Sequence, residues 1–281
     1  MPTTDIYARI QELQRRRGAS TAPTARTTPA VGRGAQEIAV TRENQGGTYG
    51  LVQRPLDQLW PGHQAALTAA ERDRTGDQLL PEHPELRALA ENFPRNCMFL
   101  DLETCGFAGS MVFLVGVIHE EGDRLLLSQL LARNYAEEHA MLRALWQIAG
   151  GNQVLASFNG KSFDWPCIHD RSTLHHIGAE SRTGLIHCDL LHHARRRWKD
   201  RLPNCRLQTL ERYVCGRRRS GDIPGSEIPM AYHDFVRSGN TRQLESILHH
   251  NALDLVTLVE LAVRVARKKE RGAKNEERGR R

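Results

Sequence analysis

The sequence predicts an α/β fold in which a mixed five-stranded sheet is flanked by helices. Three apolar runs at 97–103, 111–118 and 124–131 follow one another with turn residues between them, which is typical of an antiparallel meander. Two shorter apolar runs at 154–158 and 186–189 alternate with helical stretches. Strands that alternate with helices indicate a sheet whose faces are covered by helices.

Helices are expected before, between and after these strands. The stretch 84–92 predicts a short helix, and 136–148 predicts a longer one with four large apolar residues on one face and a glycine pair at its end. Further helices are expected after Asp164, after Asp189 and over 248–267. No internal repeat interrupts this order.

Length and composition predict one domain with extensions. The chain has 281 residues, of which 40% are hydrophobic, enough for a single core. We expect a flexible or poorly packed N-terminal extension over 1–78, the α/β domain over 79–268 and a basic tail over 269–281. Within the extension, 6–13 has the spacing of a short amphipathic helix, and 48–59 is compatible with a strand lying on the domain.

The positive charge is concentrated at one end of the sequence. Residues 264–281 hold nine Lys or Arg and three Glu, which accounts for the whole formal net charge of +6. A basic tail is usually a solvated end, but it also attracts phosphate backbones without regard to sequence.

The lack of a recognisable targeting signal and the pattern of cysteines predict a cytoplasmic protein without membrane contact. The start of the sequence lacks the basic and apolar segments of a secretory signal, and no apolar window reaches the roughly 18 residues of a membrane span. The six cysteines contain no C-x-x-C pair, so we expect them to be reduced and mostly buried. A zinc site at the neighbouring His187 and Cys188 is disfavoured, and the oligomeric state is left open.

Two carboxylates end the first predicted strand. Asp101 and Glu103 are two positions apart, so on an extended strand they share one face and leave the sheet together at its edge. In isolation such a pair is more often one solvated acid and one turn cap. Asp164 follows the next strand end, after a turn at Asn159 and Gly160, where an N-cap role is as common as a site role.

A fourth carboxylate, Asp254, stands in the segment HHNALD before a long apolar helical run. Residues four apart share a helix face, so His250 is expected beside Asp254, whereas His249 is expected to turn away. A surface His and Asp would be the ordinary interpretation of such a pair. However, an unpaired carboxylate at a buried edge is costly, and a divalent cation removes that cost.

Together, the four carboxylates predict a metal site. Ligation by oxygen alone suits Mg²⁺ or Mn²⁺ better than zinc. Two such ions activate a water and stabilise the leaving oxygen in phosphodiester hydrolysis. We expect His250 to take the proton of that water.

Three segments resemble a known set of motifs. DLET, FNGKSFDWP and HNALD resemble the three exonuclease motifs of the DEDD superfamily, which has an RNase H-like fold. More narrowly, 80–265 resembles the YprB-like RNase H-like domain family, which consists of predicted exonucleases. This narrower resemblance rests also on HCDLLHHARRRW, CRLQTLE and GDIPGSEIP.

The resemblance implies roles for individual residues. Asp101, Glu103 and Asp254 would hold the metals, and Asp164 would join the second metal directly or through water. One DEDD branch has its general base at the position of His250 and the other at that of His249, so the branch stays open. The resemblance also places Asp189 near the site, although an N-cap role for the following helix is equally compatible.

Basic residues near the motifs are candidates for substrate binding. Arg195 and Arg196 lie in the most basic stretch of the domain, next to Trp198. A solvated face is the ordinary interpretation, but arginines with an aromatic residue also suit a nucleic-acid groove. Asn159 and Lys161, inside the second motif, are expected to approach a phosphate.

The predicted function is a metal-dependent nuclease, a 3′ to 5′ exonuclease acting on DNA or RNA with two Mg²⁺ or Mn²⁺ ions. Two alternatives remain: a catalytically weak nucleic-acid-binding module on the same fold, and a structure-specific endonuclease. The sequence decides neither DNA against RNA nor the biological pathway.

Overall fold

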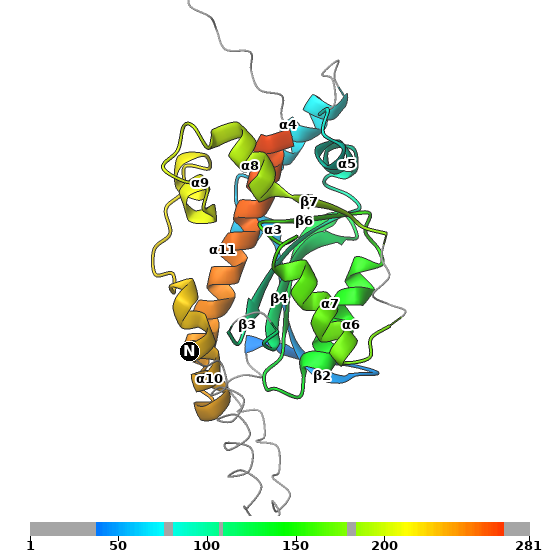
Figure 1. Cartoon of the computed structure of the whole chain (residues 1–281), viewed down its shortest axis with the longest axis vertical. Helices are drawn as coiled ribbons and strands as arrows, with labels where there is room; N and C mark the ends of the chain where they lie inside the picture. The colour runs from blue at the N-terminus through cyan, green and yellow to red at the C-terminus, as the bar shows by residue number, and fades with distance from the viewer. Residues whose placement is uncertain (1–37, 76–80, 107–108, 179–183, 267–281) are drawn as a thin grey trace, which may run out of the picture. The chain divides into compact units, whose positions relative to one another are not determined.

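The computed structural model describes residues 38–75, 81–106, 109–178 and 184–266. A seven-stranded sheet with the strand order β1-β2-β5-β4-β3-β6-β7 forms its centre (Figure 1). The strands are β1 (Val40–Asn44), β2 (Gly47–Pro55), β3 (Cys97–Thr104), β4 (Val112–Glu121), β5 (Arg124–Leu131), β6 (Val154–Ser157) and β7 (Ile186–Asp189). The helices are α3 (Leu56–Leu59), α4 (His63–Thr75), α5 (Pro84–Asn92), α6 (Glu138–Ala149), α7 (Asp164–Leu174), α8 (Leu190–Trp198), α9 (Leu207–Tyr213), the 3₁₀ turn η1 (Gly225–Glu227), α10 (Ile228–Ser238) and α11 (Thr241–Ala266).

The predicted mixed α/β sheet is confirmed. Strands β3, β4 and β5 form an antiparallel meander, and β6 and β7 run parallel to β3. Because parallel strands end on the same side, the carboxyl ends of β3, β6 and β7 meet at one edge of the sheet. Open α/β sheets build their binding sites at such an edge.

The strand number is corrected from five to seven. The two additional strands, β1 and β2, lie in the region expected to be a flexible or poorly packed extension. Strand β2 falls largely within 48–59, which was considered compatible with a strand lying on the domain, and it pairs with β5. The outermost strand, β1, is almost fully exposed, so it needs no apolar alternation and is held by backbone hydrogen bonds, which side-chain patterns do not encode. The predicted helix at 6–13 and the tail at 269–281 lie outside the described residues.

Strand β3 divides the core between the two faces of the sheet. Met98, Leu100 and Leu102 belong to the cluster that includes α6 and α7, whereas Cys97 and Phe99 belong to the cluster that includes α11 from Ala252 onward. Figure 1 shows α6 and α7 on one side of the sheet and α11 on the other. Since side chains alternate along a strand, positions 101 and 103 continue the face that α11 covers.

Helix α11 is longer than predicted and lies close against the sheet. It begins at Thr241 rather than near 248, because Leu244 and Ile247 extend its buried face into the first cluster. Positions 249–254 therefore lie inside a continuous helix. The helix approaches β4 at Gly116, where an added Cβ would lie 2.1 Å from Asn251 Oδ1, so only glycine allows this contact.

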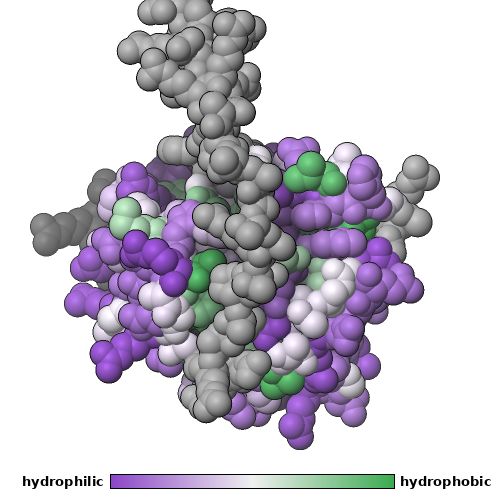
Figure 2. All heavy atoms as spheres, turned by 90° about the horizontal axis from the view of Figure 1, so that it is seen from below, coloured by the Kyte–Doolittle hydropathy of each residue, from purple (hydrophilic) through white to green (hydrophobic). Residues whose placement is uncertain are grey.

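The six cysteines are divided equally between buried and half-buried positions. All six cysteines are free. No helix among the described residues is long and apolar enough to span a membrane. On the face seen in Figure 2, hydrophobic side chains are scattered among hydrophilic ones, as is ordinary for a protein surface.

Candidate active site

Asp101 leaves β3 toward α11 and is held there by Asn251. Asn251 Nδ2 donates to Asp101 Oδ2 at 2.9 Å and approaches its carbonyl oxygen at 3.3 Å. Gln129 Nε2 donates to Asn251 Oδ1 at 2.9 Å, which orients the amide so that its N–H groups face Asp101. Both amide residues are fully buried. The sequence analysis gave neither a role, although Asn251 stands inside HNALD.

His250 and Asp254 lie side by side on α11. His250 Nε2 is 3.6 Å from Asp254 Oδ2, and His250 Nδ1 is 2.8 Å from Asp222 Oδ1. His250 is buried, whereas His249 is exposed. The structure therefore places the two histidines as the helix geometry predicts, while their catalytic roles stay predictions.

Asp222 is a site residue that was not predicted from the sequence. Its side chain is only 11% exposed. Burial opposes its ionisation, but hydrogen bonds from Arg219 and His250 outweigh burial and lower its pKa. The available signal was its position in GDIPGSEIP.

Asp164 begins α7 and is 7% exposed. The chain reaches it through a tight turn at Gly160, where an added Cβ would lie 2.3 Å from Ser157 Oγ and 3.2 Å from Asp164 Oδ2. Burial raises the pKa of Asp164 to about 7, although backbone N–H groups partly oppose this.

The carboxylates repel one another in a buried place. Burial raises the pKa values of Asp101 and Glu103 well above their usual range, and nearby carboxylates, first Asp254, raise them further. Ionising several buried acids close to one another is costly. A divalent cation bound between them offsets both the desolvation cost and the repulsion, so these acids are a suitable donor set for such an ion.

Arg219 is the second residue that the sequence analysis missed. Its guanidinium binds Asp254, reaches Glu211 at 2.5 Å and reaches Asp222 at 3.1 Å. Burial opposes its charge, but Asp254 and then Glu211 outweigh burial and raise its pKa. One predicted metal ligand is therefore already paired with a cation.

Asp189 fixes the turn of the second motif and also caps α8. Its Oδ1 accepts from the backbone N–H of Asn159 at 2.8 Å, and its Oδ2 accepts from that of Lys161 at 3.3 Å. Its Oδ1 also accepts from Leu191 N at 3.1 Å. Both roles considered for this fully buried residue are thus present in the structure.

A pocket of about 540 Å³ gathers four of the predicted residues. Arg195 lines it together with Asp101 of β3 and Asp254 of α11. The complete lining is Asp101, Phe158, Asn159, Leu191, Arg195, Asn204, Cys205, Arg206, Leu207 and Asp254.

The other two predicted substrate residues have different surroundings. Arg196 is exposed on α8 and does not line this pocket. Lys161 Nζ donates to Glu85 Oε1 at 2.6 Å, so its ammonium is paired.

The model of the RNase H superfamily matches residues 98–266. This chain belongs to the RNase H superfamily. It is also 34% identical over 176 residues to "Uncharacterized protein YprB" of Bacillus subtilis (strain 168), covering 62% of this chain and 42% of that protein. The chain thus spans less than half the length of this relative.

Among solved structures, a comparison matches part of this chain to part of the family B DNA polymerase from the hyperthermophilic archaeon Pyrobaculum calidifontis. The TM-score is 0.48 and the identity 14%, and the match covers 60% of this chain and 24% of the polymerase.

Superfamily membership confirms the predicted RNase H-like, YprB-like domain. It supports a nuclease, and RNase H-like nucleases generally use divalent metals. In the described part of this RNase H-like domain, three ligand atoms within 4.8 Å of one another occur only at His83, Glu85 and His193. No three of the four predicted carboxylates therefore bring their oxygen atoms within 4.8 Å of one another.

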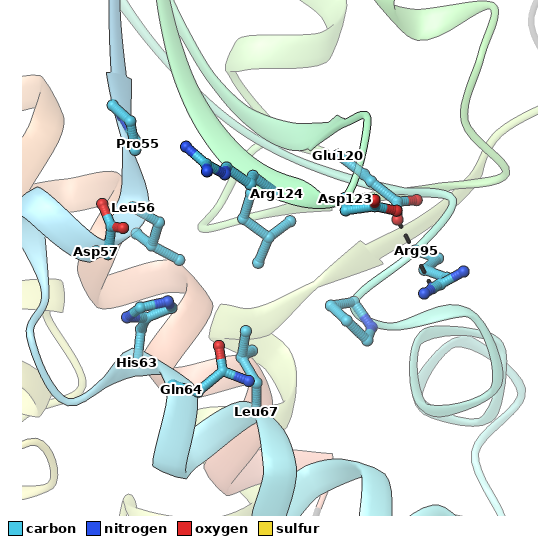
Figure 3. Close-up of a pocket in the computed structure, with 12 residues that line it drawn as sticks. Pro55, Leu56, Asp57, His63, Gln64, Leu67, Arg95, Glu120, Asp123 and Arg124 are labelled. Carbon is cyan, nitrogen blue, oxygen red and sulfur yellow. Dashed lines mark ion pairs between the residues drawn. The ribbon is translucent and has the colours of Figure 1, made fainter.

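A separate pocket of about 590 Å³ lies near the opposite end of β3. Figure 3 shows Arg124, Asp57 and His63 around it, and Arg95 paired with Glu120 at 3.6 Å. Because β3 and β4 are antiparallel, the end of β4 at Glu120 lies beside the start of β3. This pocket of the RNase H-like domain contains none of the motif carboxylates.

Proposed function

We propose that this RNase H superfamily domain is a metal-dependent nuclease that removes nucleotides from the 3′ end of DNA or RNA. The observation that carries the proposal is the pocket in which Asp101 and Asp254 meet the exposed Arg195. Carboxylates that can hold metal cations and an arginine that can bind phosphates then line the same pocket, an arrangement that suits phosphodiester hydrolysis.

Asp101, Glu103 and Asp254 would hold two Mg²⁺ or Mn²⁺ ions, with Asp164 joining the second. The raised pKa values of Asp101, Glu103 and Asp164 support this donor set, because a bound cation lowers the free-energy cost of ionising these buried carboxyl groups. When bound, the ions would make the attacking water more acidic and offset the charge on the leaving oxygen.

His250 is the proposed proton acceptor. If the ring is neutral and Nδ1 donates to Asp222, Nε2 keeps its lone pair and faces Asp254. A carboxylate behind a histidine also stabilises the imidazolium that forms when the ring takes a proton. Asp222 is thus proposed as the positioning residue for His250.

Nucleic acid is the proposed partner. Arg195 and Asn159 line the pocket with the acids and would contact the phosphate backbone. The exposed Arg196 would add a second phosphate-binding arginine on α8. Lys161 would contribute once its ion pair with Glu85 is broken. Binding through such contacts weakens as salt rises, because phosphate neutralisation releases counterions. The cytoplasmic location stays a prediction.

One observation favours the alternative of a catalytically weak binding module. Arg219 binds Asp254, so a cation of the protein occupies a position that the proposed mechanism assigns to a metal. In an active nuclease, Arg219 must yield Asp254 or share it with the ion.

An end-labelled substrate panel with Mn²⁺ tests the proposal. A ladder that shortens from the 3′ end supports the exonuclease. Internal cuts support the structure-specific endonuclease, and binding without cleavage supports the binding module. Asp101→Asn should abolish cleavage and preserve binding, because it removes ligand charge at nearly constant volume.

The matched control is Asp170→Asn, which changes an exposed acid of α7 and should cleave at the wild-type rate. Wild-type cleavage by purified Asp101→Asn would show that the active site is elsewhere.

A further inference from the structure

His83, Glu85 and His193 meet at a place that the proposed nuclease mechanism does not use. His83 directly precedes α5, Glu85 lies in its first turn, and His193 lies on α8. One ligand atom from each lies within 4.8 Å of the others. The two histidine rings are edge to face, with centroids 4.6 Å apart.

Each of the two histidines has a buried ring nitrogen without a hydrogen-bond partner. These atoms are His83 Nδ1 and His193 Nε2. His193 as a whole is only 3% exposed. Buried polar atoms nearly always have partners, and leaving one unsatisfied costs about 1–3 kcal/mol. Two such atoms beside one carboxylate indicate that a ligand completes the group.

The spacing suits a tetrahedral ion. Two ligands about 2.1 Å from a zinc ion are about 3.4 Å apart in tetrahedral geometry. His193 Nε2 and Glu85 Oε2 are 3.5 Å apart, close to that value.

We propose that His83, Glu85 and His193 form a second metal site, of the structural kind, that binds Zn²⁺ or a similar borderline divalent ion. Two imidazoles and one carboxylate favour such ions over Mg²⁺, which prefers oxygen ligands alone. This site is independent of the carboxylates proposed for catalysis.

Lys161 is the group that opposes cation binding here. Its ammonium holds Glu85 Oε1 at 2.6 Å and leaves Oε2, on the side of His193, for the ion. The site therefore adjoins the second motif, and α8 also carries Arg195 of the pocket. An ion at this place would join α5 to α8 and stiffen one wall of that pocket.

Zinc titration of the full chain in saturating Mg²⁺ tests the proposal, with Co²⁺ as a spectroscopic substitute. Asp101→Asn should keep one zinc equivalent and the visible Co²⁺ absorption of a low-coordinate imidazole site. His193→Gln and His83→Gln should each weaken zinc binding by at least about 100-fold, since the loss of outer-shell partners alone costs 10–100-fold. Zinc at one hundred times Kd should raise the wild-type melting temperature by about 5–10 °C.

The matched control is His192→Gln, which changes the exposed neighbour of His193 and should bind zinc like the wild type. His83→Gln changes a half-buried residue and keeps the test valid if His193→Gln fails to fold. Unchanged zinc affinity in a folded histidine variant would overturn the proposal. Loss of zinc binding in the Asp101→Asn variant would also overturn the proposal.

Discussion

Replacing His250 is the sharpest test of the proposed chemistry, because its neighbour provides a matched comparison. Both histidines lie inside α11, where four residues turn about 40° and five turn about 140°. His250 accordingly lies 3.6 Å from Asp254, and His249 is exposed. A histidine that accepts the proton of the attacking water contributes roughly 100-fold or more to the rate, equivalent to about 2.7 kcal/mol.

We expect His250→Ala to lower the single-turnover rate by about 100-fold and His249→Ala to lower it by less than about three-fold. The assay is cleavage of an end-labelled single strand at saturating enzyme and Mn²⁺, so that differences in binding do not contribute. Melting temperatures identify variants that fail for lack of folding, because His250→Ala also removes the 2.8 Å contact with Asp222.

Asp222→Asn separates positioning from proton transfer. It keeps the size of the side chain and removes the charge behind His250, so we expect a rate loss of about ten-fold, as is typical when a partner that orients a functional histidine is lost. A larger effect at His249 than at His250 would refute the assignment. Small effects at both would mean that neither histidine is the base.

Three further predictions follow from contacts in the same region. Gly116→Ala should destabilise the domain by about 1–3 kcal/mol in denaturant unfolding, because the new methyl group collides with Asn251. Arg219→Gln should destabilise the metal-free domain by about 3 kcal/mol or more in thermal melts, because breaking a buried ion pair leaves charges uncompensated, and Mg²⁺ should stabilise this variant more than the wild type. Asp164 should make metal-free stability fall as pH rises from about 4 to about 7: its folded pKa is raised to about 7 from 3.8, so the folded state holds the proton longer than the unfolded state. The loss is at most about 4 kcal/mol.

Each of these predictions has its own control. Gly225→Ala adds a methyl group with nothing within 4 Å and should be nearly neutral, so equal losses at both glycines would contradict the packing argument. Arg218→Gln changes an exposed arginine and should leave both stability and the Mg²⁺ effect unchanged. Asp164→Asn should remove its share of the pH dependence, and a wild-type slope in that variant would assign the titration to another group.

The sequence by itself determined which local elements carry the carboxylates. The alternation of β3 placed Asp101 and Glu103 on one face, and the four-residue spacing placed His250 beside Asp254. Strands β3, β4 and β5 were predictable as a meander for the same reason. Periods of two and of about four residues are local properties of strands and helices, so they can be recognised without knowing what lies across from them.

Only the tertiary structure decided which partners surround those carboxylates. Asn251 reaches Asp101 across 150 positions of the chain, Arg219 reaches Asp254 across 35, and Asp222 reaches His250 across 28. No periodicity relates such positions, because the order of the strands and the path of the loops bring them together. The group of His83, Glu85 and His193 arose in the same way.

The edge strand β1 was also decided by the tertiary structure. Strand β1 is held by backbone pairing to β2, and β2 by pairing to β5. Every residue except proline offers the same backbone donor and acceptor, so pairing at an exposed edge leaves almost no trace in the side-chain pattern. The buried strands were predictable because burial selects apolar residues. The exposed edge strand was not predictable, because backbone hydrogen bonding alone does not select any type of side chain.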